Sequence, residues 1–377
     1  MPLAIHRLLR QDPTPETLAA FVDEHTIPLA EGTSVTFLYQ GSADRVELRH
    51  FIYGLESSQP FTRIGETDYW YLVMTLPEGS RVEYKIDVIH GDDHNWIRDP
   101  LNPHLAFDPF GANSVCQASG YERPEWTLPD PEARPGTLEE HHLHSEAFED
   151  PRHFQVYLPA RFRSQRSYPL LVVHDGHDYL HYAGLQTVLD NLIHRLEIPP
   201  MIVALTNSPD RLLEYADDPR HGRFIVEELL PYLEQHYPLQ PEPASRCLMG
   251  ASFGGVASLA TAWRYPGVFS RLLLQSGSFA FTDIGRHQRG PVFDPVVKFV
   301  NAFRAEPGRP AERVFLSCGV YESLIYENRS MMPLLRELGL DVRYVEARDG
   351  HNWENWRDRL RQALSWLFPG PLWMVYE

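Results

Sequence analysis

The sequence predicts an α/β domain with a mainly parallel sheet, preceded by a smaller β-sandwich domain. Short alternating segments run from about residue 33 to 118, a proline-rich stretch follows, and fully apolar segments then alternate with helical ones. The length of 377 residues also exceeds the usual size of one hydrophobic core. We therefore expect two domains, residues 1–130 including a linker and residues 131–377.

The N-terminal segments have the period of two that is typical of strands with one buried face. These segments are 35–39, 46–49, 70–74 and 82–88. A turn over 77–80 precedes the last of them. Residues 122–137 then carry four prolines and no periodicity, which indicates an extended linker.

The second half of the chain has the pattern of strands buried on both faces by helices. Apolar strands are expected at 154–158, 170–173 and 201–205, with helices at 185–196 and 222–236. Strands of this kind belong to a mainly parallel sheet, because the helices of the crossover connections cover both of its faces.

A Gly-x-Ser-x-Gly pattern occupies residues 250–254, between the apolar strand 246–249 and a helical segment. So short a pattern also occurs by chance, but strand, turn and helix are the context of the nucleophile elbow of α/β hydrolases. We expect Ser252 to be the nucleophile, because Gly250 and Gly254 would let strand and helix pass closely. The Phe253 amide, at the start of the helix, would stabilise an oxyanion.

The chain order of this fold is serine, acid, histidine, which places the base near the C-terminus. His351 follows a predicted strand and turn, and it is our candidate base. Glu322 follows the preceding strand and is our candidate acid, although a carboxylate there could also serve only a helix N-terminus. Glu327 is the rival acid, and Asp349 is too close to the histidine in sequence.

Further candidates lie on loops after predicted strands. The second oxyanion donor should be the amide of His177, because Gly176 permits a close backbone approach. Arg211, Asp175 and Trp353 are candidate substrate contacts. Arg211 could bind an anionic substrate or pair with Glu214, and the sequence leaves both interpretations open.

Three groups could suggest metal sites: two that contain His and Asp, at 174–178 and 90–94, and one that contains three histidines, at 141–144. They lack the helical spacing or the cysteine pairs that make such a prediction specific, so we expect no metal. The cysteines are too few for a disulfide framework and are expected to be buried thiols. They are Cys116, Cys247 and Cys318.

Charge and hydropathy exclude two kinds of partner. The net charge of −17, without a cluster of Lys and Arg, argues against binding of nucleic acid. No run of eighteen apolar residues and no secretory signal pattern is present, so we expect no membrane contact and a cytoplasmic location.

Together these residues resemble the enterochelin (ferric enterobactin) esterase group of the esterase-D-like α/β hydrolases. The stretches that carry the resemblance are 168–176, 210–211 with 214–215, 230–231, 250–255, 275–278, 349–351 and 356–357. In addition, 98–103 and 108–111 resemble the end of the immunoglobulin-like early-set domain that precedes the hydrolase in this group. The resemblance implies hydrolysis of a carboxylic ester without a cofactor, with Ser252 as nucleophile, His351 as base and Glu322 as acid.

The resemblance leaves the substrate open, since members of the group hydrolyse siderophore trilactones and feruloyl or acetyl esters of polysaccharides. A cytoplasmic location favours a siderophore, whereas the net negative charge argues against an anionic ferric catecholate. Two other hypotheses are an acyltransferase and a carbohydrate-binding protein with an inactive hydrolase domain.

Overall fold

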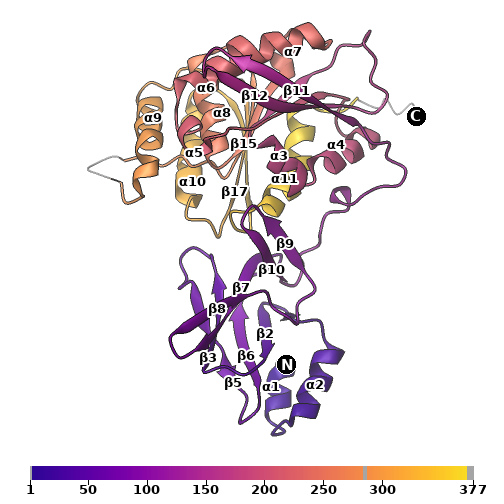
Figure 1. Ribbon diagram of the computed structural model, residues 1–377, viewed down its shortest axis with the longest axis vertical. Helices are drawn as coiled ribbons and strands as arrows, with labels where there is room; N and C mark the ends of the chain where they lie inside the picture. The colour runs from indigo at the N-terminus through magenta and orange to yellow at the C-terminus, as the bar shows by residue number, and fades with distance from the viewer. Residues whose placement is uncertain (1, 283–286, 372–377) are drawn as a thin grey trace. The chain divides into compact units, whose positions relative to one another are not determined.

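The computed structural model describes residues 2–282 and 287–371, which form two units (Figure 1). The first unit runs to Arg123 and also includes Gly319–Glu322 and Ala347–Asn352. The second unit contains the remaining residues from Pro124 onward. The division falls seven residues before the expected boundary at residue 130 (130 minus 123), and the two returning segments were not expected from the sequence.

Two antiparallel sheets form most of the first unit. One has the order β1-β2-β6-β5, and the other has the order β4-β3-β7-β10-β9 with β8 paired to β7. The strands are β1 (Leu29–Glu31), β2 (Ser34–Gln40), β3 (Arg45–His50), β4 (Ser58–Pro60), β5 (Thr62–Arg63), β6 (Tyr69–Thr75), β7 (Arg81–His90), β8 (Asp93–Ile97), β9 (Leu105–Asp108) and β10 (Gly111–Gln117). Each of the four strands predicted from period-two patterning lies within β2, β3, β6 or β7, because alternate residues of these strands face one shared apolar core.

Two N-terminal helices, α1 (Ala4–Leu9) and α2 (Pro15–Glu24), were not predicted. The Thr14 side chain caps α2 by accepting a hydrogen bond from the Thr17 amide. Leu18 and Phe21 of α2 pack against apolar residues of β2 and β6 that lie outside the shared core. These helices are short, so tertiary packing rather than intrinsic propensity stabilises them.

An eight-stranded sheet forms the centre of the second unit, in the order β11-β12-β14-β13-β15-β16-β17-β18. Its strands are β11 (Thr137–Ser145), β12 (Asp150–Leu158), β13 (Leu170–Val173), β14 (Ile202–Thr206), β15 (Arg246–Ala251), β16 (Arg271–Gln275), β17 (Arg313–Gly319) and β18 (Asp341–Ala347). β11 and β12 are antiparallel to their neighbours, and the strands from β14 to β17 pair in parallel.

β18 also runs parallel to β17. The Asp341 amide donates to the Glu312 carbonyl at the start of β17, at 2.8 Å. The Val320 amide, just past the end of β17, donates to the Ala347 carbonyl at the end of β18, also at 2.8 Å. Segments that follow β15, β17 and β18 therefore leave the sheet at the same edge.

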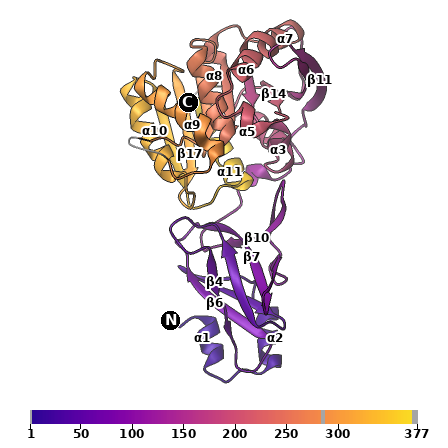
Figure 2. The same cartoon turned by 60° about the vertical axis from the view of Figure 1, so that its left-hand side comes forward.

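Helices cover both faces of this sheet, as predicted for a mainly parallel sheet (Figures 1 and 2). One layer holds α3 (Gly176–His181), α4 (Leu185–His194) and α11 (Trp353–Leu367). The other holds α6 (Pro219–Arg223), a π-helical segment (Phe224–Leu229), α7 (Leu230–His236), α8 (Phe253–Arg264), α9 (Asp294–Ala305) and α10 (Ile325–Glu337), with the short α5 (Arg211–Glu214) nearby. Among the described residues no helix has the length and apolar composition needed to cross a bilayer.

Candidate active site

Ser252 lies between the end of β15 and the start of α8, with φ 57° and ψ −120°. A residue with a side chain pays on the order of 1–3 kcal/mol for such a backbone conformation, so it persists only where the surroundings impose it. The Ser252 amide donates to the Gln275 carbonyl at 2.9 Å, and its carbonyl accepts from the Ser278 amide at 3.1 Å. The strand-turn-helix context expected for Ser252 is therefore present.

Different neighbours crowd the two glycines that flank Ser252. A Cβ atom at Gly250 would lie 2.3 Å from the carbonyl carbon of Gly254, so no side chain fits between strand and helix. A Cβ atom at Gly254 would instead meet the Cβ of His174 at 3.2 Å, which is tight but not a collision with the strand. The predicted steric exclusion thus holds fully at Gly250, and at Gly254 the crowding comes from the loop after β13.

Ser278 was not among the predicted site residues, although it belongs to a stretch that carries the family resemblance. Its Oγ lies 3.2 Å from Ser252 Oγ, slightly beyond the usual range for a hydrogen bond between two hydroxyl groups. Ser278 follows β16, which pairs in parallel with β15, so both serines lie at the same edge of the sheet. The position of a serine just after a central strand was the available sequence signal.

The two predicted oxyanion donors differ in their present partners. As the first residue of α8, Phe253 has an amide without an acceptor inside the helix. The amide of His177, by contrast, donates to Oδ1 of Asn207 at 3.0 Å. Gly176 does permit the predicted close approach, since a Cβ there would lie 2.5 Å from the Leu205 Cα.

His351 and Glu322 form a hydrogen-bonded pair in the first unit. Nδ1 of His351 lies 2.7 Å from Oε2 of Glu322. The carboxylate is buried, and its Oε1 accepts the Gly319 amide at 2.6 Å. An ionised carboxylate only accepts, so it selects the imidazole tautomer that carries a proton on Nδ1 and a lone pair on Nε2.

The rival carboxylates have other partners. Glu327 pairs with Arg289 at 2.5 Å. Oδ1 of Asp349 accepts from the Gly350 amide at 2.7 Å and from Nδ2 of Asn352 at 2.8 Å. Burial raises the pKa of Asp349 to about 6, and the nearby Arg81 guanidinium opposes this rise. The geometry therefore favours Glu322 over both alternatives as the acid that orients His351.

Arg211 does not pair with Glu214, so that interpretation is wrong. Its Nε lies 2.9 and 2.8 Å from the two carboxylate oxygens of Asp175, and Glu214 instead accepts two bonds from Arg152, both at 2.9 Å. A second Arg211 nitrogen donates to the Ala251 carbonyl at 3.3 Å, directly before the elbow. Burial raises the pKa of Asp175 to about 6, with Arg211 acting in the opposite direction.

Behind the elbow, two buried imidazoles contact each other. Nε2 of His174 lies 2.9 Å from Nε2 of His221, and Nδ1 of His174 lies 3.0 Å from both the Met249 carbonyl and Ser258 Oγ. One imidazole must accept from the other, and burial lowers the pKa of both, that of His174 to about 4. The sequence offered no signal for His221, which is distant in the chain from the loop after β13.

Among the described residues no cluster of three or more His, Cys, Asp or Glu side chains could hold a metal ion.

The predicted substrate contact Trp353 lies in an aromatic cluster of the second unit. Its ring packs edge-on against Tyr179 at 5.2 Å and Trp356 at 4.8 Å, and at an angle to Tyr182 at 5.8 Å. Trp353 and Tyr182 are only half-buried. Nε1 of Trp356 donates to Ser276 Oγ at 2.9 Å, which joins this cluster to the loop after β16.

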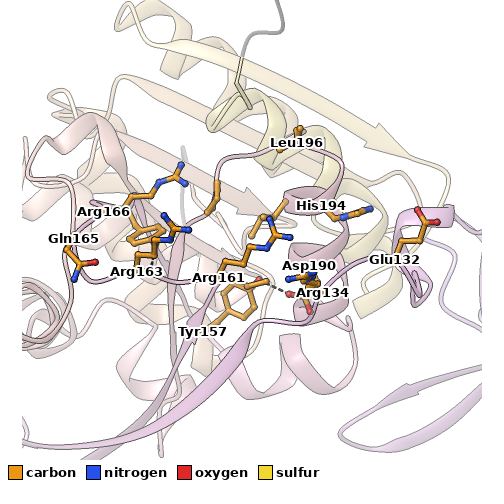
Figure 3. Close-up of a pocket in the computed structure, with 14 residues that line it drawn as sticks. Glu132, Arg134, Tyr157, Arg161, Arg163, Gln165, Arg166, Asp190, His194 and Leu196 are labelled. Atoms are coloured by element: carbon orange, nitrogen blue, oxygen red, sulfur yellow. Dashed lines mark hydrogen bonds between the residues drawn. The ribbon is translucent and has the colours of Figure 1, made fainter.

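The second unit also has a pocket of about 860 Å³ that includes Tyr157 and Asp190, joined by a hydrogen bond of 2.7 Å (Figure 3). Four arginines line it, namely Arg134, Arg161, Arg163 and Arg166. The pocket lies beside the beginnings of β13 and β14, whereas Ser252 follows the end of the parallel strand β15. It is therefore at the opposite edge of the sheet from Ser252.

Comparisons with known proteins identify a family and related esterases. A model of the Esterase family matches residues 145–367. The iron(III) enterobactin esterase of Escherichia coli O6:H1 is 25% identical over 337 residues, which cover 82% of each chain. The enterobactin esterase of Shigella flexneri, solved in the presence of enterobactin, matches with a TM-score of 0.73 and 23% identity over 89% of this chain and 92% of that one. A ferulic acid esterase of Anaeromyces mucronatus matches 64% of this chain and 94% of its own, with a TM-score of 0.53 and 17% identity.

Proposed function

Since this chain belongs to the Esterase family, we propose that it hydrolyses carboxylic esters through an acyl-enzyme formed on Ser252. The observation that carries the proposal is the strained, positive-φ backbone of Ser252 between β15 and α8. Glu322 and His351 support it, because they follow β17 and β18, which run parallel to β15, and are hydrogen-bonded to each other. Serine, acid and histidine also occur in the chain order of α/β hydrolases.

In the proposed mechanism, Nε2 of His351 removes the Ser252 proton while Oγ attacks the ester carbonyl carbon. Glu322 holds the Nδ1 proton and stabilises the imidazolium. When the tetrahedral intermediate collapses, the carbon–oxygen bond to the alcohol breaks and His351 gives its proton to that oxygen. Water, deprotonated by His351, then attacks the acyl-enzyme and releases the acid and free Ser252.

The oxyanion is assigned to the amides of Phe253 and His177. The Phe253 amide stands at the N-terminus of α8, where the helix dipole also favours negative charge. The His177 amide would have to exchange the Asn207 side chain for the substrate oxygen. In this proposal the ester carbonyl replaces Asn207 Oδ1 as the acceptor of the His177 amide.

For the substrate, we propose a siderophore ester of the enterobactin type. The half-buried rings of Tyr182 and Trp353 present an aromatic surface to a flat aryl group, and Arg211 offers a partly exposed cation. The relatives from Escherichia coli and Shigella flexneri are esterases of enterobactin by name. The net charge of −17 favours a neutral ester instead, and the ferulic acid esterase similarity supports a feruloyl ester as the second candidate.

The two sheets of the first unit support the further proposal that it is an immunoglobulin-like early-set sandwich. Both sheets contribute side chains to one apolar core, as sandwich folds require. This assignment rests on the resemblance of residues 98–103 and 108–111 and on the sheet arrangement.

The proposal is tested with purified protein on ferric enterobactin and a feruloyl sugar ester, beside the Ser252→Ala variant. We expect wild type to hydrolyse ferric enterobactin faster, and Ser252→Ala to lose at least about a thousandfold in turnover while its thermal midpoint is unchanged. Unchanged hydrolysis by the variant would overturn the serine assignment. Absence of fluorophosphonate labelling of Ser252, with retention on a polysaccharide, would favour the carbohydrate-binding hypothesis. Acyl transfer to an added alcohol in preference to water would favour the acyltransferase hypothesis.

A further inference from the structure

The loops that carry Glu322 and His351 are joined to each other by backbone hydrogen bonds. The Val320 amide donates to the Ala347 carbonyl at 2.8 Å, and the Tyr321 amide donates to the Asp349 carbonyl at 3.2 Å. At Gly319 the approach is so close that a Cβ atom would lie 2.2 Å from the Asp349 carbonyl oxygen. The two loops therefore behave as one local structure, and both belong to the first unit.

Arg81, the first residue of β7, attaches the His351 loop to the N-terminal part of that unit. Its side chain is buried, with 1% of its surface exposed. The Arg81 amide donates to the Arg348 carbonyl at 2.9 Å. One guanidinium nitrogen donates to Asp349 Oδ1 at 3.3 Å and to Asn352 Oδ1 at 3.1 Å, so it contacts residues on both sides of His351.

The opposite side of the guanidinium is also held. Its other terminal nitrogen donates to Glu83 Oε1 at 3.0 Å, two residues further along β7. The planar fork of an arginine can make such contacts in several directions at once, whereas a lysine ammonium acts as a point charge. Glu83 of β7 therefore holds the Arg81 side chain, and Arg81 in turn holds the loop of His351.

The Glu322 loop is attached to the same place by Ser80, the neighbour of Arg81. Ser80 Oγ lies 2.6 Å from the Tyr321 hydroxyl, and the Tyr53 amide donates to the Tyr321 carbonyl at 2.9 Å. Tyr321 directly precedes Glu322. Consecutive residues of the N-terminal part thus contact the loop of the acid and the loop of the base.

We propose that Arg81 is a positioning residue for the ester chemistry, which keeps His351 bonded to Glu322 by bridging Asp349 and Asn352. This inference rests on the proposed function of Ser252, Glu322 and His351. The N-terminal part of the chain would then contribute to the reaction, because the orientation of His351 depends on the Arg81 side chain of β7. Without Arg81, the buried carboxylate of Asp349 would lose its cation, and the loop would have to rearrange to hydrate or protonate it.

The test compares Arg81→Met and Arg81→Lys with the matched control Arg49→Met. Arg49 lies on β3 of the same unit and pairs at 3.1 Å with Asp87, another buried carboxylate. Among the described residues, it forms no hydrogen bond or ion pair with the loop of Glu322 or the loop of His351. Both methionine variants therefore remove an arginine that pairs with a buried carboxylate, but only Arg81 contacts the loop of His351. Each full-length variant is assayed on an activated ester well below its thermal midpoint.

A second readout reports the position of His351 directly. A proton shared between Nδ1 of a histidine and a carboxylate gives a strongly downfield proton resonance, and His351→Gln assigns it. We expect Arg81→Met to lose this resonance and to lower kcat about a hundredfold with KM within about threefold, as expected for a small misplacement of a catalytic group. Arg81→Lys should lower kcat about tenfold, since an ammonium cannot reproduce the fork. Arg49→Met should keep the resonance and a kcat within about threefold of wild type.

A folded Arg81→Met that keeps both the resonance and kcat would overturn the inference. If this variant does not fold, a folded Arg81→Lys with unchanged resonance and kcat overturns it equally. An equal loss in Arg49→Met would reduce Arg81 to a general contribution to stability and would also overturn it. Failure of the proposed function looks different: Ser252→Ala would then retain hydrolysis, while the resonance would still report whether Arg81 positions His351.

Discussion

The proposed nucleophile and the proposed acid–base pair are built in different ways. Ser252 is placed by residues close to it in the chain, since β15, the tight turn and α8 follow one another without interruption. Glu322 and His351 come from separate loops and meet through side chains, with support from Arg81 near the other end of the sequence. A local turn can be recognised as a motif, whereas a long-range pair needs the folded chain.

The largest expected effect tests which carboxylate completes the acid–base pair. Glu322→Gln should lower kcat/KM on an activated ester about a thousandfold, because an amide cannot hold the His351 tautomer or stabilise the imidazolium. Glu327→Gln is the matched variant and should stay near wild type, since Glu327 pairs with Arg289. Steady-state kinetics at matched folded concentration decide between them, and the reverse pattern would transfer the role to Glu327.

The next effect tests how tightly the turn around Ser252 is packed. In Gly250→Ala the new methyl group would meet the Gly254 backbone at 2.3 Å, so the elbow must open. We expect a loss of about 3 kcal/mol in unfolding free energy, the upper end for overpacking, with a large fall in labelling of Ser252 by a fluorophosphonate. Gly290→Ala is the control, since a Cβ there meets nothing within 4 Å. A wild-type labelling rate in Gly250→Ala would show that the elbow is not tightly packed.

A third effect, of about the same size, concerns the two imidazoles behind the elbow and appears only in acid. Burial holds the folded-state pKa of His174 near 4 and lowers that of His221, so the unfolded chain binds these protons first as the pH falls below about 6.5. Their contribution is constant above that pH and decreases from pH 6.5 toward 4, by about 3 kcal/mol for His174. Buried Asp175 and Asp349 act in the opposite direction, because their raised pKa values favour the protonated folded state.

The contribution of the imidazoles is therefore measured as a difference. Wild type and the double variant His174→Asn, His221→Asn are unfolded in urea at several pH values. We expect the stability advantage of wild type to be greatest near pH 7 and to shrink toward pH 4. An advantage that is independent of pH would show that the histidines are not buried in their neutral form.

The smallest expected effect concerns Arg211, which contacts both Asp175 and the Ala251 carbonyl. If its exposed side binds the anionic substrate, Arg211→Met should raise KM for ferric enterobactin about tenfold, the size of one lost charged contact, and leave a neutral ester almost unchanged. Arg220→Met, which removes an exposed arginine paired with Asp218, is the control. An equal loss of kcat on both esters would instead assign Arg211 to support of the elbow.

Several features could be predicted from the sequence because they depend on neighbours in the chain. Period-two alternation predicted β2, β3, β6 and β7, and the apolar runs predicted buried strands of the larger sheet. The short N-terminal helices escaped prediction, because their stability comes from packing on the first unit. The helix predicted at 222–236 is present but contains a π-helical segment, a change of hydrogen bonding that periodicity does not reveal.

By itself, the sequence determined the Gly-x-Ser-x-Gly turn between a strand and a helix, and the α/β class with its buried strands, because turn sterics and hydrophobic periodicity act over a few residues. The tertiary structure decided the pairing of side chains: His351 with Glu322, Arg211 with Asp175, His174 with His221. It also brought Arg81 to the loop of His351. These choices depend on which groups become neighbours in a desolvated interior, where each buried charge or donor needs a partner that lies far away in the chain.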